Sequence, residues 1–269
     1  MSNSDYVHGY SAAESQRLSD QASTLSDLLH HDSVFHPDGL VLEAGCGTGA
    51  QTVIVALQNP RCNFVSIDIA EDSLAKAEEN IQKKKIRNVR FRVADVFNLP
   101  FDNESFDHVF VCFLLEHLRE PIGALTSLKR VLREGGTITV IEGDHGSAYY
   151  HPRSSAAQAT IQCLIDVQAL MGGNSLIGRE LYPLMVTAGF KDVSVSPRIV
   201  YADASKPEMV DGFTRKTFIA MVEGVREQAI GNRLITETEW SQGIADLYRS
   251  ADSEGTFCYT FFKAVGRKT

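Results

Sequence analysis

The nine residues Val41-Leu-Glu-Ala-Gly-Cys-Gly-Thr-Gly49 decide the fold of this 269-residue chain. They begin in a short apolar run, contain three glycines within five residues, and lead into a helical pattern over 52–57. Glycine lets a backbone turn tightly and approach a ligand closely. The stretch therefore predicts a buried strand, a ligand-binding turn and a helix. It also satisfies the dinucleotide pattern Gly45-x-Gly47-x-x-Ala50, so the turn alone leaves two cofactor classes open.

The flanking sequence alternates between strand and helix patterns. Between the turn and residue 142 we expect further strands over 64–67, 89–93, 107–112 and 137–141, and helices over 73–82 and 121–132. Strands that alternate with helices at this spacing form a mainly parallel sheet with right-handed crossovers. Ligands of such sheets bind at the carboxyl ends of the strands. After residue 142 we expect helices over 155–171, 175–188 and 206–230, strands over 192–200 and 256–264, and a capping box at Thr236-Glu-Thr-Glu239.

Composition excludes several classes of protein. Lys and Arg number 26 and Asp and Glu number 34, and the resulting charge of −8 argues against a sequence-independent nucleic-acid binder. No window approaches 18 apolar residues, and the start lacks a signal-peptide pattern, so we expect a cytoplasmic protein without a membrane span. The five cysteines form no Cys-x-x-Cys pair, and the histidines show no metal-ligand spacing, so we expect no metal.

Three acidic residues distinguish between the two cofactor classes. Glu43 lies two residues before the first glycine, where it would repel a pyrophosphate and attract a cation. Asp68 ends the second predicted strand, where a carboxylate accepts ribose hydroxyls. Asp95 ends the third strand and is placed to accept a hydrogen bond from an aminopurine. A ligand with adenine, ribose and a positive charge but no phosphate is S-adenosylmethionine.

These segments together resemble the class I S-adenosylmethionine-dependent methyltransferases of the small-molecule type. The resemblance covers residues 40–142 in the family's order: the 41–49 turn, Ile67-Asp68-Ile69, Ala94-Asp95-Val96, Leu99-Pro-Phe101, Ser105-Phe-Asp107 and Leu128–Gly136. It implies a doubly wound α/β fold with a mainly parallel, seven-stranded Rossmann-like sheet, an antiparallel last strand and a helical lid. Without a linker in the later sequence, we expect a single domain over 1–269, with an N-terminal helical cover (1–36), a cofactor-binding core (40–142) and acceptor-side helical insertions (143–256).

The resemblance also assigns cofactor contacts to positions of this chain. Gly45, Cys46 and Gly47 would contact the amino-acid part through their backbone, and Glu43 would hold the amino group or its water. Asp68 would bind the ribose, Ile69 would pack on the adenine, and Asp95 and Val96 would read the adenine edge. Phe113 and Leu114 would line the methionine side. Ile69 and Leu114 fit a hydrophobic core equally well.

A predicted helix at the N-terminus carries a leader resembling that of a subset of these enzymes. Arg17 and Gln21 share one of its faces, because spacings of three and four residues align side chains. We expect Tyr10, Arg17 and Gln21 to close over the cofactor, with Arg17 near its carboxylate; the alternative is a solvated face. We expect His30-His31, at the end of this helix, in solvent.

Methyl transfer is a displacement for which the protein mostly supplies alignment, and a base is needed only if the acceptor loses a proton. The candidates beyond the fourth and fifth strands are His117, Asp144 and His145, although structural roles fit them too. Arg179 is expected to pair with an acidic substrate or to anchor the lid to a carboxylate. Aromatic residues of the later segments are lid candidates: Tyr149, Tyr150, Phe213, Phe218 and Trp240.

The sequence therefore predicts an enzyme that transfers a methyl group from S-adenosylmethionine to a small-molecule acceptor, without nucleic-acid or membrane partners. Two alternatives stay open. One is an S-adenosylmethionine-binding module without catalysis, since the binding motifs do not depend on turnover. The other is a nicotinamide-dependent oxidoreductase, against which Glu43, Asp95 and the lack of a third strict glycine count.

Overall fold

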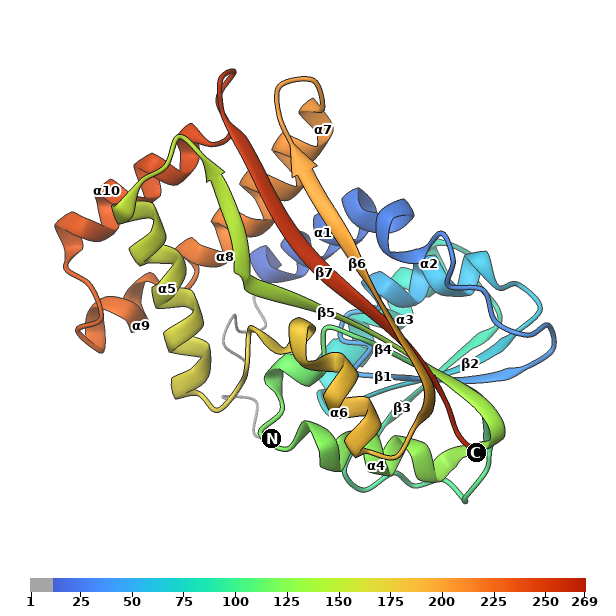
Figure 1. Ribbon diagram of the computed structural model, residues 1–269. Coiled ribbons are helices and arrows are strands. Elements are labelled where there is room, and N and C mark those ends of the chain that lie inside the picture. The colour runs from blue at the N-terminus through green and yellow to red at the C-terminus, as the bar shows by residue number, and fades with distance from the viewer. Residues whose placement is uncertain (1–11) are drawn as a thin grey trace.

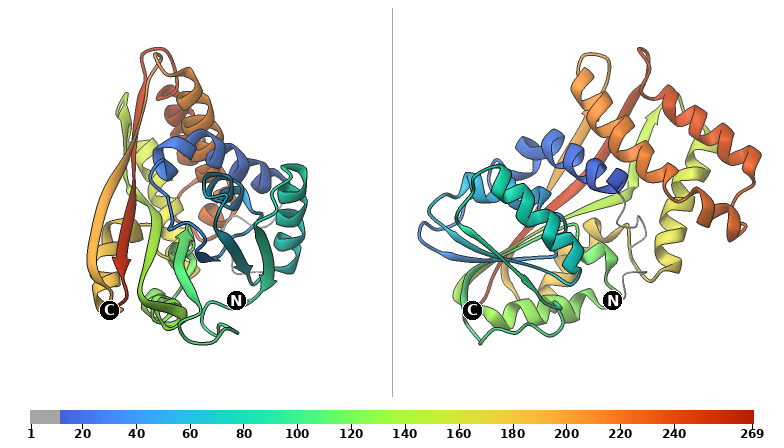
Figure 2. Two further views of the ribbon diagram at one scale, coloured as in Figure 1. Left: turned by 90° about the vertical axis from the view of Figure 1, so that its right-hand side faces the viewer. Right: turned by 180° about the vertical axis from the view of Figure 1, so that it is seen from behind.

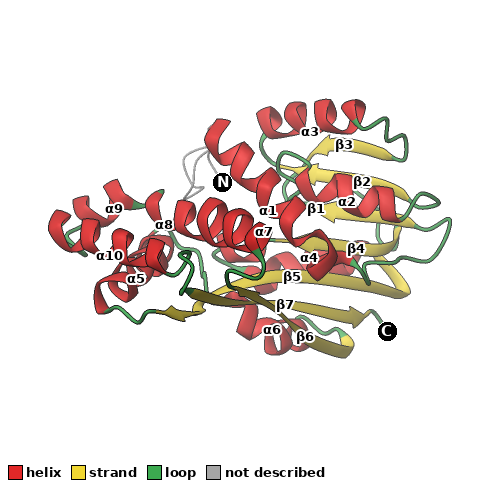
Figure 3. Cartoon of the chain, turned by 90° about the horizontal axis from the view of Figure 1, so that it is seen from above, coloured by secondary structure: helices red, strands yellow, loops and turns green. Residues whose placement is uncertain are grey.

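A seven-stranded mixed sheet forms the centre of the molecule. The computed structural model describes the chain from residue 12 to 269, with side chains from residue 17 onward except that of residue 19. The strand order is β3-β2-β1-β4-β5-β7-β6 (Figure 3). The strands are β1 (Leu40–Ala44), β2 (Asn63–Asp68), β3 (Val89–Val93), β4 (Phe106–Cys112), β5 (Leu132–His151), β6 (Lys191–Ala202) and β7 (Thr256–Arg267). The first five are parallel and β7 is antiparallel to both its neighbours, which confirms the predicted fold class.

Helices cover both faces of this sheet. Helices α1 (Ala12–His30), α2 (Ala50–Gln58) and α3 (Glu71–Lys83) lie behind it in Figure 1 and in front of it in the reverse view of Figure 2. Helices α4 (Pro121–Val131) and α6 (Leu181–Thr187) cover the other face. Val41 belongs to the first core and Leu42 to the second, because successive strand residues point to opposite faces. The predicted strand of apolar residues is therefore buried on both sides.

The sheet extends well beyond its parallel part. β5 continues to His151 instead of ending near Ile141, because β7 pairs with it on both sides of a register break between Asp144 and Tyr149. β6 pairs along β7 in the same region, so three antiparallel strands rise above the parallel strands (Figure 1). Helices α5 (Ser155–Leu170) and α10 (Glu237–Arg249) lie beside this extension.

The later helices are shorter and less regular than the sequence pattern predicts. The expected helix over 206–230 divides into α7 (Pro207–Met209), the π-helix η3 (Val210–Ile219), α8 (Ala220–Glu223) and α9 (Arg226–Gly231). The expected helix over 175–188 divides into the 3₁₀ turn η2 (Ile177–Glu180) and α6. The capping box is confirmed: the Thr236 hydroxyl accepts the Glu239 amide, and the Glu239 carboxylate accepts the Thr236 amide.

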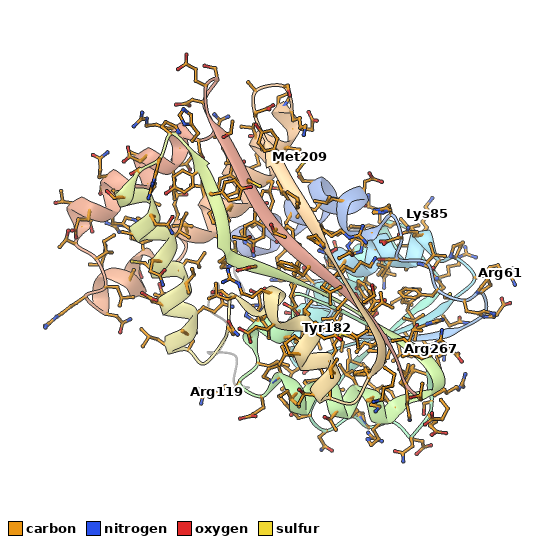
Figure 4. All side chains as sticks on the ribbon, viewed as in Figure 1. Arg61, Lys85, Arg119, Tyr182, Met209 and Arg267 are labelled. Carbon is orange, nitrogen blue, oxygen red and sulfur yellow. The ribbon has the colours of Figure 1, made fainter. Side chains whose placement is uncertain are left out.

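The carboxyl ends of the parallel strands lie toward the extension. At the opposite ends, the labelled side chains of Arg61 and Lys85 precede β2 and β3 (Figure 4). The two ends are thus separated by the length of the strands, and the glycine turn after β1 lies on the side of the late helices. Within residues 12–269, no helix is long and apolar enough to span a membrane.

Candidate cofactor site

At two of the three glycines in the turn, neighbouring atoms occupy the space that a side chain would need, and at the third this space is open. Gly45, Gly47 and Gly49 all have positive φ angles, of 73°, 51° and 78°. A side chain at Gly45 would meet Leu114 Cδ1 at 2.8 Å, and one at Gly49 would meet Ala77 Cβ at 2.9 Å. A Cβ at Gly47 would have no atom within 4 Å. The turn is therefore tightly packed on either side and open at Gly47, where a ligand can approach the backbone.

Asp68 fixes this turn to the end of β2. One of its carboxylate oxygens accepts the Gly47 amide at 2.8 Å, and the other accepts the Ala70 amide at 2.9 Å. The amides of Gly45 and Cys46 donate to the Ile67 carbonyl. Each carboxylate oxygen of Asp68 keeps a second acceptor position, because an ionised carboxylate offers about four lone-pair sites. The side chain can thus hold the turn and still receive hydroxyl donors.

The end of β3 supplies the next acidic residue. Asp95 is partly buried, and one of its oxygens accepts the Phe97 amide at 2.9 Å. Val96 is buried in the core beside it, whereas Ile69 is 40% exposed. Ile69 therefore does not belong to the core, and its packing on the adenine stays a prediction. Leu114, by contrast, is partly buried against the core while also contacting Gly45.

Glu43 lies beneath the turn. Its side chain is buried, and one oxygen accepts the Ser66 hydroxyl at 2.6 Å. Burial raises the pKa of Glu43 to about 7, although the Ser66 hydrogen bond opposes the shift. The carboxyl is therefore close to the balance between its protonated and charged forms at neutral pH, and a nearby cation would favour the charged form.

The end of β4 turns sharply into the site. Phe113 has a φ of 57°, an uncommon angle for a residue with a side chain, and its amide donates to Ile141. The amides of Leu114 and Leu115 both donate to Glu142 Oε1, at 3.0 and 2.7 Å. Glu142 is completely buried, and burial followed by the neighbouring Glu116 raises its pKa well above the usual range. Glu142 thus shapes the turn that carries Phe113 and Leu114.

Two of the three predicted residues of the N-terminal helix lie on its buried face. Arg17 and Gln21 are 9% and 7% exposed, and Arg17 Nη1 donates to Gln21 Oε1 at 3.1 Å. Burial lowers the pKa of His145, which lies in the far part of β5, and the positive charge of Arg17 lowers it further. The interpretation of this face as solvated is therefore wrong. Tyr10 lies outside the described residues.

The C-terminal end of the same helix is buried as well, which corrects the expectation for His30. Its ring is 1% exposed and contacts Gln51 through Nε2 at 2.7 Å. Burial lowers the pKa of His30 to about 4, so the ring is neutral at pH 7. His31 is exposed, as expected. Sequence position predicted a helix end but could not show that α2 and β7 cover it.

The three catalytic candidates have different surroundings: His117 follows β4, whereas Asp144 and His145 lie in the far part of β5. His117 Nε2 lies 3.7 Å from Glu116 Oε1. Asp144 is 3% exposed and binds Arg179 through both oxygens, at 2.8 and 2.7 Å. Arg179 therefore anchors the segment after α5 to a carboxylate of the chain. His145 is buried, its Nδ1 lies 2.8 Å from the Tyr259 hydroxyl, and its Nε2 has no hydrogen-bond partner among the described residues.

Three buried polar residues of this region were missed by the sequence analysis. Glu142 and Tyr259 lie within strand patterns, and Gln168 lies on α5, where its amide nitrogen donates to Glu116. A glutamate directly after the apolar run 137–141 was a signal for Glu142, but nothing in the sequence pairs Tyr259 with His145. Of the lid candidates, Phe213, Phe218 and Trp240 are core residues, Tyr150 is partly buried, and Tyr149 is 68% exposed.

The residues of this site fit S-adenosylmethionine. The open position at Gly47 gives backbone access, the carboxylates of Asp68 and Asp95 retain acceptor positions, and the exposed Ile69 offers an apolar surface between them. Glu43 adds a carboxyl that a cation can ionise. Among residues 12–269, no cluster of three or more His, Cys, Asp or Glu side chains is arranged to hold a metal ion.

Comparisons with known proteins agree with this site. A family model described as a methyltransferase domain matches residues 35–189. An uncharacterised methyltransferase of Schizosaccharomyces pombe is 33% identical over 147 residues, which is 52% of each chain. The 27-O-demethylrifamycin SV methyltransferase of Amycolatopsis mediterranei is 24% identical over 261 residues, covering 96% of this chain and 88% of the relative.

The fold is also found among solved structures. The phosphoethanolamine N-methyltransferase 2 of Haemonchus contortus, in complex with phosphomonomethylethanolamine and S-adenosylhomocysteine, has a TM-score of 0.57 and 16% identity, covering 91% of this chain and 52% of that one. The chain spans about half the length of several curated relatives that it matches. The family model covers more than half of the chain described here. The chain therefore belongs to the class I S-adenosylmethionine-dependent methyltransferases, and S-adenosylmethionine is its cofactor.

Proposed function

We propose that this protein transfers the methyl group of S-adenosylmethionine to a small-molecule acceptor by in-line displacement, which leaves S-adenosylhomocysteine. The observation that carries the proposal is the arrangement of Glu43, Asp68 and Asp95 at three neighbouring strand ends around the open position of Gly47. The relative that matches nearly the whole chain is a methyltransferase of a rifamycin, which supports a small molecule as the acceptor.

The cofactor-binding roles follow from these positions. The backbone of Gly45, Cys46 and Gly47 faces the amino-acid part, with Glu43 beneath its ammonium group. Asp68 accepts the ribose hydroxyls, and Ile69, Asp95 and Val96 form the adenine subsite. Phe113 and Leu114 line the methionine side, and Arg17 and Gln21 cover it. The same role is proposed for Tyr10, which lies outside the described residues. When bound, the cofactor supplies an activated methyl group, and the chain aligns the acceptor with it.

The acceptor side of the site lies beyond β4 and along the far part of β5, within a single domain that also contains the late helices. The carboxylate of Asp144 is paired with Arg179, so Asp144 anchors the segment after α5 that carries Arg179. His117 is adjacent to Glu116, and His145 presents a ring nitrogen without a partner. His145 is thus the strongest of the three candidates for contact with the acceptor.

Two measurements test this function. Isothermal titration with S-adenosylmethionine and then with NADH separates methyl transfer from nicotinamide chemistry, and binding of NADH alone would overturn the proposal. Release of label from S-adenosylmethionine carrying a radioactive methyl group, in the presence of a metabolite extract, separates an enzyme from a binding module. Binding without transfer to any extract fraction would support the binding module instead.

The cellular setting is proposed on a separate observation. All five cysteines are free thiols buried in the fold, which suits a reducing compartment such as the cytoplasm. The negative charge of the chain favours a small molecule over a nucleic acid as the partner.

A further inference from the structure

The strongest unexplained feature is a buried pair on the acceptor side, His145 and Tyr259. Both side chains are almost fully buried, at 4% and 1% exposure, and the Tyr259 hydroxyl lies 2.8 Å from His145 Nδ1. Within the part of the chain that the structure describes, the other ring nitrogen, Nε2, is buried without a hydrogen-bond partner. A buried polar atom without a partner is uncommon in native proteins and calls for an explanation.

The backbone holds His145 in place independently of its ring. β5 leaves its register with β7 between Asp144 and Tyr149, so residues 145–148 face Tyr259 without ladder pairing. The His145 amide donates instead to the Ser175 carbonyl at 2.9 Å. Bulges of this kind redirect side chains and are frequent next to active sites. The ring is further held by an edge contact with Phe218 of the π-helix, whose centroid lies 6.2 Å away.

The surroundings of Tyr259 determine which ring nitrogen carries the proton. The Tyr259 hydroxyl lies against Gly143, where a Cβ would approach it to 2.4 Å. Burial raises the pKa of Tyr259 well above its ordinary value, so the phenol keeps its proton. Because Nδ1 is the hydrogen-bond partner of the phenol among the described residues, the phenolic proton is directed to it. A neutral ring that accepts at Nδ1 carries its own proton at Nε2.

The ring itself is neutral at pH 7. Burial lowers the pKa of His145; Arg17 of α1 and His117 lower it further, and Glu116 and Asp144 oppose the shift. The unpartnered Nε2 is therefore a hydrogen-bond donor. A ring nitrogen that carries a proton cannot remove a proton from the methyl acceptor. An ammonium group of the acceptor would also be a hydrogen-bond donor, so it could not form a hydrogen bond with this N–H group.

We infer that His145 contacts the methyl acceptor as a hydrogen-bond donor through Nε2–H. Tyr259 is the positioning residue that fixes this tautomer. The acceptor presents a neutral oxygen lone pair, of a carbonyl or hydroxyl group, to the Nε2–H group. This inference rests on the proposed function for its substrate, but the tautomer is a property of the chain alone. His145 is then a specificity residue for oxygen-bearing acceptors.

The tautomer is tested by NMR of the full chain with ¹⁵N-labelled histidine, in the presence of S-adenosylhomocysteine. Long-range ¹H–¹⁵N spectra separate protonated from unprotonated ring nitrogens, and His145→Gln identifies the signal among the eight histidines. We expect Nε2–H in the unmodified chain and a mixture of tautomers in Tyr259→Phe. Tyr149→Phe, which changes an exposed tyrosine of β5, is the matched control and should leave the signal unchanged. Nδ1–H in the unmodified chain, or an unchanged signal in Tyr259→Phe, would overturn the inference.

A second variant keeps this test decisive if Tyr259→Phe does not fold. Gly143→Ala places a Cβ against the Tyr259 hydroxyl and should displace it, so it should give the same mixture as Tyr259→Phe without removing the phenol. If Tyr259→Phe does not fold, the Gly143→Ala spectrum decides: a signal identical to that of the unmodified chain contradicts the inference.

The contact with the acceptor is tested by methyl release with the metabolite extract as probe. The amide nitrogen of glutamine can donate from the place of Nε2, whereas alanine leaves the acceptor oxygen without a donor. We expect His145→Ala to lose about ten-fold or more of the rate and His145→Gln to keep most of it. Equal losses in both variants would indicate a base and overturn the donor role. If the unmodified chain releases no methyl group, the proposed function fails, while the tautomer experiment still stands.

Discussion

At the scale of the residue, each glycine of the 45–49 turn lacks a side chain for its own reason. Gly45 faces Leu114 and Gly49 faces Ala77, so packing excludes a Cβ at both. Gly47 faces open space, and its amide is held by Asp68. Sequence patterns identify all three as a set, but only the folded chain shows that the middle one faces open space.

Gly47→Ala is therefore expected to weaken cofactor binding more than folding. The positive φ should cost about 1–2 kcal/mol of stability, as it does for any residue with a Cβ in this region. Gly135→Ala is a matched control, because Gly135 also has a positive φ of 77° and no atom near its Cβ position, but lies before the parallel part of β5. Both variants should lose similar stability in urea unfolding, and only Gly47→Ala should raise the S-adenosylmethionine dissociation constant, by about ten-fold. Equal affinities would show that the space above Gly47 is not used.

Glu43 predicts a pH dependence of cofactor binding. Its folded pKa of about 7 lies above the unfolded value of 4.5, so the protonated form is favoured by folding and the free energy of unfolding falls as the pH rises between these values. A cationic ligand reverses this preference and must displace the proton. Between pH 5 and 7 we expect the affinity for S-adenosylmethionine to rise by up to about ten-fold per pH unit.

Glu43→Gln should remove this slope. Titration calorimetry in two buffers of different ionisation enthalpy measures the released proton directly. The dependence on Glu43 is refuted if, at pH 6, the glutamine variant releases as many protons on binding S-adenosylmethionine as the unmodified chain does. The sequence predicted the carboxylate and its sign, but not its raised pKa, because burial beneath the turn depends on how β1 packs between β2 and β4.

At the scale of the element, α1 is joined to the sheet at its C-terminal end. Lys263 of β7 is buried, and its ammonium donates to the Leu29 carbonyl, the Ser33 hydroxyl and Asp32 Oδ1, at 3.3, 2.8 and 2.6 Å. A cation at a helix C-terminus satisfies carbonyls that have no partner within the helix. The helix that carries Arg17 and Gln21 is thereby fixed to the last strand of the chain.

Lys263→Met is expected to loosen α1. Unpaired helix carbonyls and Ser33 should cost about 1–3 kcal/mol of unfolding free energy, measured in urea. Because α1 also covers the site, the S-adenosylmethionine dissociation constant should rise several-fold. Lys216→Met, which removes an exposed pair with Asp211, serves as control and should change stability by about 0.5 kcal/mol or less. A Lys263→Met protein as stable as this control would show that the anchor is dispensable.

Elements near the site were predicted unevenly. The capping box at Thr236 and the strands of the parallel sheet follow local rules, and their positions were predicted closely. The π-helix was not, because the wider turn depends on a distant contact: Gly212 lies against Thr24 of α1, where a Cβ would approach to 2.3 Å. Residues almost two hundred positions apart cannot be paired by periodicity.

At the scale of the whole molecule, one strand connects the parallel part of the sheet with its antiparallel extension. β5 belongs to the parallel sheet at its start and to the antiparallel extension at its end. A single, mainly parallel, seven-stranded sheet with an antiparallel last strand was predicted from alternation and the family resemblance, but its strand order was not. The length of β5 was not, since the sequence beyond Ile141 has no strand-like alternation.

We therefore expect a single cooperative unfolding transition. Trp240, the only tryptophan, lies buried on α10 beside the extension, so its fluorescence reports the late helices. Far-UV circular dichroism reports the whole chain, and the two curves in urea should coincide. A tryptophan transition at clearly lower urea than the circular dichroism transition would contradict the single-domain organisation.

The break in pairing at residues 145–148 has a consequence for how such a chain can vary. The ladder is in register on both sides of the break, at Asp144 with Thr260 and at Tyr149 with Cys258. Adding or deleting a residue within 145–148 would therefore leave both stretches of pairing intact. It would change only how far the 145–148 segment reaches toward the proposed acceptor, and how that segment is oriented. This segment is a natural position for insertions that retune substrate choice, and the first place for an engineer to vary loop length.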